Sequence, residues 1–256
     1  MCNGQYVLVN PSDVMQLFIY CRSNPTYEII RQLCDCCEID VTDEEVFHLY
    51  SQYCSLDRGD LFLDVLFSRI RDNEEADEGA VRLAVTTLNS VYHTRLYRPV
   101  ETAGRLKDDY RVIIGHFRND RIIDAVEIIT NINTQAELQN HTYSFASKFC
   151  SFMDEMSFPI FDKYSSNMIY TYLKMKSNSG ENVRYKYKKY LGIPDYFLGA
   201  YNEFIDLYEL ENNYKNVDIF LWMYGKMLEL KKLKNFDMVS YISLENRREL
   251  AHYPVT

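Results

Sequence analysis

The sequence predicts an all-α protein, and three observations support this prediction. Apolar residues recur at steps of three and four through most of the 256 residues, which is the period of an amphipathic helix. Proline, glycine and serine break this pattern at Pro99, Pro159, 177–180 and 192–194. The composition, 47% hydrophobic and 25% charged, is that of an ordinary globular chain. We therefore expect helices around one hydrophobic core.

The N-terminal third contains the clearest helix start. The alternating stretch QYVLV (5–9) allows one short strand. Thr42 is followed three residues later by Glu45, which is the spacing of a capping box, so a helix begins there. A further apolar helical pattern follows over 58–72, and the acidic run 73–79 is typical of a helix entrance or a linker.

The same period continues to the C-terminal region. The first helix after residue 79 carries apolar residues on one face, namely Val81, Ala84, Val85, Leu88, Val91 and Tyr92. Further helices are expected at roughly 100–116, 120–131, 135–152, 162–176, 195–211 and 216–234.

Charge divides the chain into two parts. The net charge is −9, but residues 1–79 hold only five of the 28 basic residues and sixteen of the 37 acidic ones. We therefore expect an acidic N-terminal helical region over 1–79 and a helical core over 80–256, with the acidic region as a candidate site for a protein partner. Residues 163–190 carry seven basic residues and Glu181 as their one acid. Such a run indicates either a nucleic-acid-facing surface or a solvated helix face.

The cysteines and known motifs exclude several classes of protein. The CDCC stretch (34–37) lacks the spacing of common zinc sites, and free cysteine packs as a small hydrophobe. We expect reduced structural thiols, no metal, no cofactor and a cytoplasmic location. No phosphate-binding loop or metalloprotease motif is present in the sequence. No apolar run reaches the ~20 residues of a membrane span, and the N-terminus lacks the features of a signal peptide.

The segment FASKFCSFMDEMSFPIFDKYSS (145–166) holds the candidate chemistry. Lys148 stands among small, apolar and aromatic residues, and Asp162 precedes a predicted helix that it would cap. A lysine held against apolar surface tends to lose its proton and becomes a nucleophile. Alternatively, the lysine stem lies over apolar surface with its ammonium in water. The catalytic interpretation requires the two functional atoms to lie within ~10 Å of each other in one pocket.

This segment resembles the core of the helix–hairpin–helix DNA glycosylase superfamily, in a divergent branch related to 8-oxoguanine glycosylases. TTLNSVYHTRL (86–96) and VDIFLWMYGK (217–226) are similar to its early and late core helices. The resemblance implies a DNA repair or defence enzyme with lyase activity. It implies that Lys148 attacks C1′ of a flipped-out nucleotide to form a Schiff base, and that Asp162 stabilises positive charge at the sugar.

The chain departs from the family before the lysine. The family has a glycine-containing hairpin turn there, whereas this chain reads LQNHTYSFASK (138–148) without glycine. Two interpretations follow: an active DNA glycosylase with a remodelled hairpin, or a non-catalytic helical module that binds protein or nucleic acid.

Two further groups of residues are candidates for contact with DNA. Aromatic residues that would line a pocket for an extruded base are Phe145, Phe149, Phe158, Tyr164 and Trp222, although aromatics at helical spacing also form cores. Basic residues that would contact the DNA backbone are Lys163, Lys174, Lys176, Arg184, Lys186, Lys188 and Lys189. They alternate with Tyr185, Tyr187 and Tyr190, whose rings would stack on unpaired bases.

Overall fold

The protein is all-α, as predicted. The computed structural model describes residues 8–71, 77–94, 96, 98–132 and 139–234. These residues form α1 (Pro11–Ser23), α2 (Tyr27–Cys36), α3 (Asp43–Arg71), α4 (Glu78–Tyr92), α5 (Pro99–Arg118), α6 (Ile122–Asn131), α7 (Gln139–Met153), α8 (Lys163–Asn178), α9 (Pro194–Leu207) and α10 (Tyr214–Lys234), with a 3-10 turn at Lys188–Tyr190. No strand occurs among them, and most of the QYVLV stretch lies outside the described residues. In the described part of the chain, no helix is long and apolar enough to cross a membrane.

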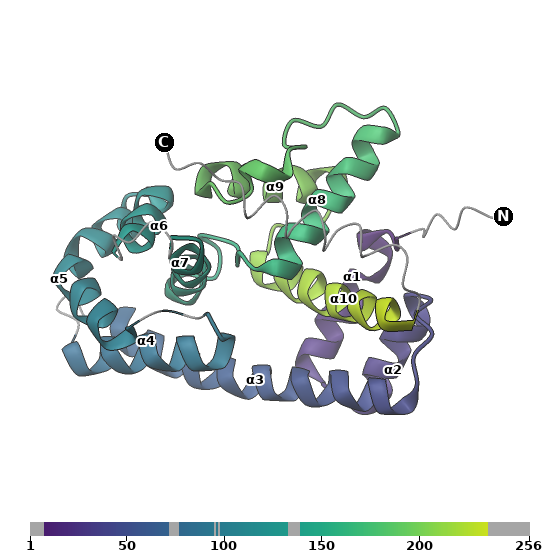
Figure 1. The fold of residues 1–256 in the computed structure, drawn as a ribbon, viewed down its shortest axis with the longest axis horizontal. Coiled ribbons are helices and arrows are strands. Elements are labelled where there is room, and N and C mark those ends of the chain that lie inside the picture. Colours follow the sequence, from purple (N-terminus) through teal and green to yellow (C-terminus); the bar gives the residue numbers. More distant parts are fainter. Residues whose placement is uncertain (1–7, 72–76, 95, 97, 133–138, 235–256) are drawn as a thin grey trace.

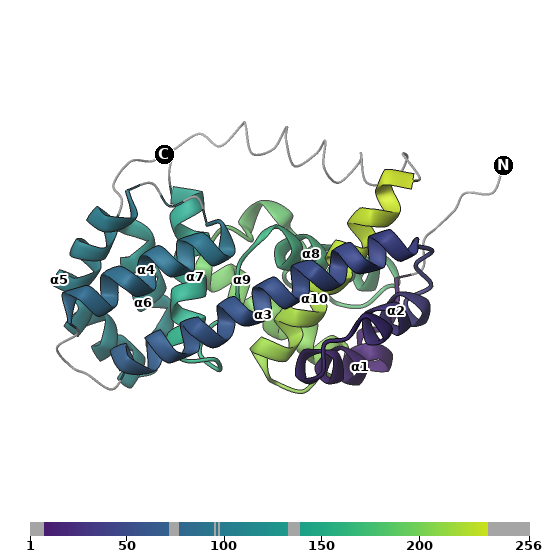
Figure 2. The same ribbon diagram turned by 90° about the horizontal axis from the view of Figure 1, so that it is seen from below.

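Helix α3 joins two groups of helices (Figure 1). Helices α4 to α7 gather at its C-terminal end, whereas α1, α2, α8 and α10 lie toward its N-terminal end, and α9 lies between them, packed on α8 and α6. Figure 2 shows α3 running along one face of the molecule past both groups. It packs against α2, α4, α7 and α10. The chain therefore returns to its N-terminal helices after building the first group, and α1 packs on α10.

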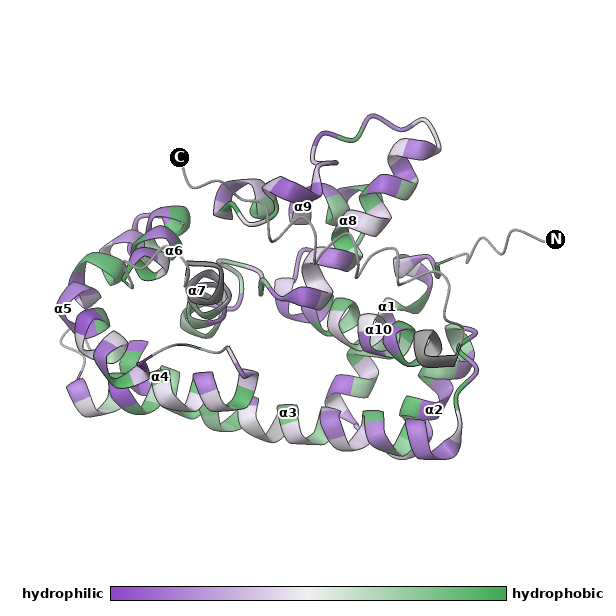
Figure 3. Ribbon diagram, viewed as in Figure 1, coloured by the Kyte–Doolittle hydropathy of each residue, from purple (hydrophilic) through white to green (hydrophobic). Residues whose placement is uncertain are grey.

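Helix α3 is longer than predicted, because the sequence indicated two helices where the structure has one. The predicted capping box at its start is confirmed: Thr42 N–H donates to Glu45 at 2.7 Å, and Glu45 N–H donates to the Thr42 hydroxyl at 3.3 Å. Gly59 lies inside the helix instead of ending it. A Cβ there would lie 2.5 Å from Val91 of α4, so the glycine permits close packing of the two helices. Figure 3 shows hydrophobic (green) and hydrophilic (purple) residues interspersed along α3.

The core is rich in aromatic residues and includes buried thiols. Phe67 packs against Phe149 in an edge-to-face arrangement with ring centroids 5.1 Å apart. Cys34 and Cys37 are buried in the same core, and burial raises the pKa of each thiol to about 12. These two cysteines therefore pack as hydrophobic side chains and are unreactive at neutral pH.

Candidate functional site

The side chain of Lys148 is buried at the junction of α7 and the α7–α8 connection (154–162). It is 2% exposed. Its Nζ lies 2.9 Å from Ser144 Oγ, 3.4 Å from Ser144 O and 3.2 Å from Phe161 O. The amine donates hydrogen bonds to the Ser144 hydroxyl and to the carbonyls of Ser144 and Phe161.

The amine has no carboxylate partner in direct contact. Among the described residues, no acidic oxygen lies within the 4.0 Å that defines an ion pair with Lys148. Burial lowers the pKa of Lys148, and the more distant charges of Asp162 and Asp218 partly oppose this effect. Tyr92 presents its ring 5.6 Å from Nζ. Burial thus shifts the amine toward its uncharged form, whereas the Tyr92 ring and the two acidic residues favour the ammonium.

Asp162 caps α8, as the sequence predicted. Its Oδ1 accepts hydrogen bonds from Tyr164 N and Ser165 N, both at 2.8 Å. Its own N–H donates to Ser165 Oγ at 3.0 Å, which completes a capping box. Because Lys148 bonds to the carbonyl of Phe161, the preceding residue, the amine lies next to the capped end of α8.

Asp218 is a member of the site that sequence reasoning missed. It projects from α10, is 8% exposed, and accepts hydrogen bonds from Ile160 N at 2.9 Å and from the Tyr201 hydroxyl at 2.7 Å. Burial raises the pKa of Asp218 to about 8. The available signal was a lone acid within the apolar stretch VDIFLWMYGK (217–226).

Three side chains hold the end of the α7–α8 connection. Asp218 binds the N–H of Ile160, Ser147 Oγ accepts from the N–H of Phe161 at 3.0 Å, and Lys148 donates to the carbonyl of Phe161. Consecutive backbone groups are thus fixed from two helices. The amine of Lys148 is both a candidate nucleophile and a support for this segment.

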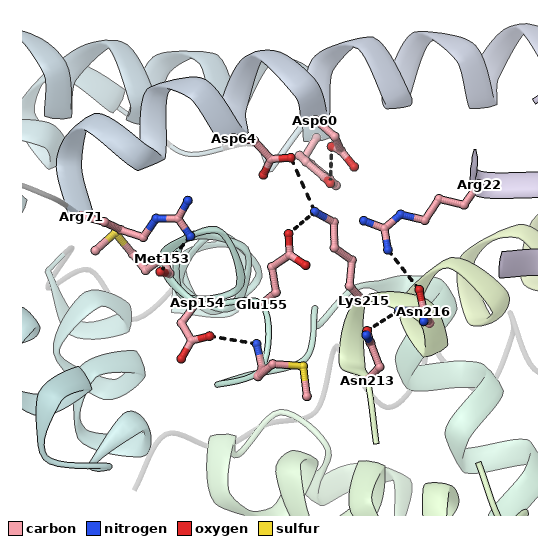
Figure 4. A network of polar contacts seen from close by, with 12 residues as sticks. Arg22, Asp60, Asp64, Arg71, Met153, Asp154, Glu155, Asn213, Lys215 and Asn216 are labelled. Atoms are coloured by element: carbon pink, nitrogen blue, oxygen red, sulfur yellow. Dashed lines mark hydrogen bonds and ion pairs between the residues drawn. The ribbon is translucent and has the colours of Figure 1, made fainter. Parts of the chain in front are cut away.

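A second polar network lies at the start of the same connection (Figure 4). Lys215 of α10 extends between Glu155, at 2.5 Å, and Asp64 of α3, at 3.6 Å. Asp60 of α3 accepts a hydrogen bond from the Tyr92 hydroxyl at 2.7 Å. Burial raises the pKa of Asp60 to about 6, although the Tyr92 hydrogen bond lowers it. This network joins α3, α4, α10 and the connection.

The five predicted base-pocket aromatics fall into two groups. Phe145, Phe149 and Phe158 are fully buried core residues. Tyr164 and Trp222 are partly exposed, and both rings lie 5.3 Å from the amine of Lys226, a residue the sequence analysis did not single out. Only this second group has ring surface near solvent.

The basic segment is similarly divided. Lys163 pairs with Glu229 at 2.5 Å and Lys176 with Glu181 at 2.9 Å, so acids offset these two charges. Lys174 and Lys188 each lie 5.5 Å from the ring of Tyr170. These three residues form one basic aromatic cluster.

The end of this segment presents further rings. Arg184, Lys186 and Lys189 are exposed, and Lys189 lies 4.7 Å from the ring of Tyr190. Tyr187 and Tyr190 are 53% and 38% exposed. Tyr185 instead packs over Gly199, where a Cβ would lie 2.3 Å from the ring, so it does not present a free face.

An open hollow of about 590 Å³ lies elsewhere, between α5 and α6. Its lining includes Asp109, His116, Arg121 and Asp124, and no residue of α7 or α8. The arrangement of Lys148 is therefore a buried polar cluster and not the wall of this hollow. A cavity shared by Lys148 and Asp162 stays a prediction.

Comparison with known proteins yields one family model. The model HI_0787_N, described as an N-terminal domain, matches residues 44–157. The match covers α3 to α7 and includes Lys148, but it ends before Asp162 and Asp218. No curated protein and no solved structure matches the chain.

Proposed function

We propose that this protein is a DNA base-excision glycosylase with lyase activity, in which Lys148 forms a Schiff base. The observation that carries the proposal is the buried amine of Lys148, whose polar contacts among the described residues are uncharged oxygens and whose pKa burial lowers. The similarity of the segments around Lys148 and Asp162 to the helix–hairpin–helix glycosylases supports the same chemistry.

The proposed reaction uses the neutral amine as nucleophile. Its lone pair attacks C1′ as the glycosidic C–N bond breaks, and the leaving base takes the electron pair of that bond and the proton that the attached amine loses. Opening of the sugar ring yields an imine between Lys148 and C1′, from which β-elimination of the 3′ phosphate cleaves the strand. Asp162 stabilises the positive charge that develops at the sugar in the transition state.

Substrate access requires the covering segment to move. The amine is buried beneath the connection, and its bond to Phe161 O closes the site. We infer that an extruded nucleotide displaces residues 158–162 and takes the place of the Phe161 carbonyl beside the amine. Asp218 and Ser147, which hold the same segment, then set how readily it opens.

The exposed basic and aromatic residues supply the DNA surface in this proposal. The cluster of Tyr170, Lys174 and Lys188 offers both charge and a ring, and Tyr187 and Tyr190 offer further rings. Lysines of this kind contact phosphates, and exposed rings stack on unpaired bases.

Borohydride trapping tests the proposal directly. The probe is a labelled DNA duplex with one abasic site, which presents the aldehyde without requiring the identity of the damaged base. Wild type is expected to give a covalent adduct that peptide mass spectrometry places on Lys148, and Lys148→Met is expected to reduce it by at least ~100-fold.

The matched control is Lys215→Met, which removes another largely buried lysine at the same connection. It is expected to retain the adduct. Circular dichroism of both variants verifies that they fold. An adduct of equal yield in Lys148→Met contradicts the proposal.

A second candidate is a non-catalytic helical module that binds nucleic acid or protein. It is favoured by the three hydrogen bonds that occupy Lys148 and by its burial, which suit a purely structural role. This alternative predicts no adduct in wild type. The trapping experiment therefore separates the two candidates.

A further inference from the structure

Helix α3 exposes large apolar side chains that no described part of the chain covers. Phe47 is 59% exposed, Leu61 62%, Phe62 51% and Val65 53%. Single exposed apolar residues are common on protein surfaces, but several on one helix mark an interaction surface.

These residues lie on a single stripe of α3. At 100° per residue, Phe47 and Val65 coincide in direction, and Leu61 and Phe62 lie within about 60° of them. Exposed Ser51 falls on the same stripe. So do Glu44, near the start of the helix, and Arg69, near its end. We call these seven residues the α3 stripe.

The α3 stripe faces away from the rest of the molecule. Figure 1 shows α3 along one edge of the molecule, and Figure 2, seen from that side, shows it in front of the helices it packs against. The opposite face of α3 is the buried one, and includes Leu63, Phe67 and Ile70, each 0% exposed. The helix spans about 43 Å, so the stripe is long enough for an extended contact.

The charges at the two ends of the stripe are opposite, which suits pairing with an antiparallel copy of the same helix. The first turn of α3 contains Asp43, Glu44 and Glu45, and the last contains Arg69 and Arg71. Neither Glu44 nor Arg69 has an ion-pair or hydrogen-bond partner among the described residues. A second α3 laid antiparallel places acidic ends against basic ends, whereas a parallel one places like charges together.

We propose that the α3 stripe binds the α3 stripe of a second copy of this chain, antiparallel, in a two-fold symmetric dimer. In one register, Glu44 lies opposite Arg69 of the second copy, Phe47 opposite Val65, and Ser51 opposite Leu61 and Phe62. The small serine leaves space for the phenylalanine ring, and symmetry repeats each contact.

Light scattering coupled to size-exclusion chromatography tests the dimer with the full chain. Wild type is expected at twice the chain mass of 30.4 kDa and to dissociate on dilution. Leu61→Glu combined with Val65→Glu is expected to give monomer with unchanged circular dichroism, because both positions are exposed. Val112→Glu, at a 54% exposed apolar site on α5, is the matched control and keeps the dimer.

Charge reversal tests the antiparallel register. Glu44→Arg alone and Arg69→Glu alone are each expected to weaken the dimer by about tenfold, and the double variant to restore it. A monomeric wild type at every dilution overturns the dimer. Failure of the double variant to recover, with the apolar variants still monomeric, overturns the antiparallel register. Dimer loss in Val112→Glu but not in the α3 variant places the contact elsewhere and also overturns the proposal.

Discussion

Lys148 and Lys215 contact opposite ends of the same α7–α8 connection but are satisfied in different ways. Lys215 contacts two carboxylates, Glu155 and Asp64, and its side chain is 15% exposed. Lys148 is more deeply buried and contacts a hydroxyl and two carbonyl oxygens. Among the described residues, the lysine at the start of the connection therefore has carboxylate partners, whereas the lysine at its end has none.

The difference decides which lysine is available for chemistry. Burying an ammonium without a counter-ion is costly, so burial shifts Lys148 toward its uncharged form. Lys215 pairs with two carboxylates, whereas burial lowers the pKa of Lys148, which is the property that a nucleophilic lysine requires. Asp218 also affects this difference. Its raised pKa reduces the negative charge that it presents to Lys148.

The largest expected effect on stability is that of Asp218→Ala. The substitution leaves the Ile160 N–H without its acceptor in the interior, and leaves the Tyr201 hydroxyl only its longer bond to Tyr214 O at 3.3 Å. We expect a loss of about 2–4 kcal/mol in the free energy of unfolding, measured by urea denaturation. Asp64→Ala, which removes a more exposed partner of Lys215, is expected to cost less than about 1 kcal/mol. Equal losses would show that the polar contacts at the two ends of the connection contribute equally to the free energy of unfolding.

The next effect concerns pH. The pKa of Asp218 rises from 3.8 to about 8 on folding, so the folded state holds a proton that the unfolded state has lost between these values. Stability from this group therefore falls as pH rises from 3.8 to about 8, by up to about 1.4 kcal/mol per pH unit. Lys148 acts with the opposite sign, because its lowered pKa removes stability as pH falls through it.

Asp218→Asn isolates the carboxyl contribution. Its amide does not titrate, so the urea-derived stability is expected to depend less steeply on pH between 3.8 and about 8 than that of wild type. The comparison uses slopes and not absolute values, since the amide also alters one hydrogen bond. Parallel pH profiles for the two proteins would contradict a raised pKa at Asp218.

A smaller effect separates the two lysines by salt. Lys215→Met removes an ion pair whose carboxylates are 38% and 44% exposed, so it is expected to cost at most about 1 kcal/mol, and less at high salt. Lys148→Met removes a group without a counter-ion, and its effect on the free energy of unfolding is expected to be independent of salt. Denaturation at low and high ionic strength measures both, and a salt-sensitive Lys148→Met would contradict the assignment.

Local spacing in the sequence was sufficient for two helix starts and for one half of the site. The capping box at Thr42 and Glu45 and the cap at Asp162 each involve residues at most three apart, so their spacing is visible in the sequence. Asp218 was not predictable in this way. Its bond to Ile160 spans 58 residues, and such pairing depends on how α10 returns to the α7–α8 connection.

Packing also overrode two local signals. Gly59 is a weak helix former, but contact with Val91 keeps it inside α3. The alternation of basic residues with Tyr185, Tyr187 and Tyr190 suggested three equivalent rings, whereas Gly199 admits Tyr185 and leaves only the other two exposed. The number of rings available for stacking depends on α9, which the local pattern does not encode.

The smallest expected effects belong to a third class of lysine, on the basic segment, where Lys186 and Lys189 are exposed and Lys188 is partly exposed. In the proposed function Lys186, Lys188 and Lys189 act through charge on phosphates and not as nucleophiles. Each phosphate contact adds about −0.9 to the log–log dependence of duplex affinity on salt, so alanine at all three is expected to flatten the slope by roughly one unit per lost contact. Fluorescence anisotropy with two unrelated duplex sequences measures the slope. Both sequences are expected to weaken equally, because phosphates carry no sequence information. The borohydride adduct on Lys148, formed at saturating DNA, is expected to be unchanged. A slope equal to that of wild type would show that this segment does not contact DNA. Loss of the adduct at saturation would show that one of these three lysines has the nucleophilic role proposed for Lys148.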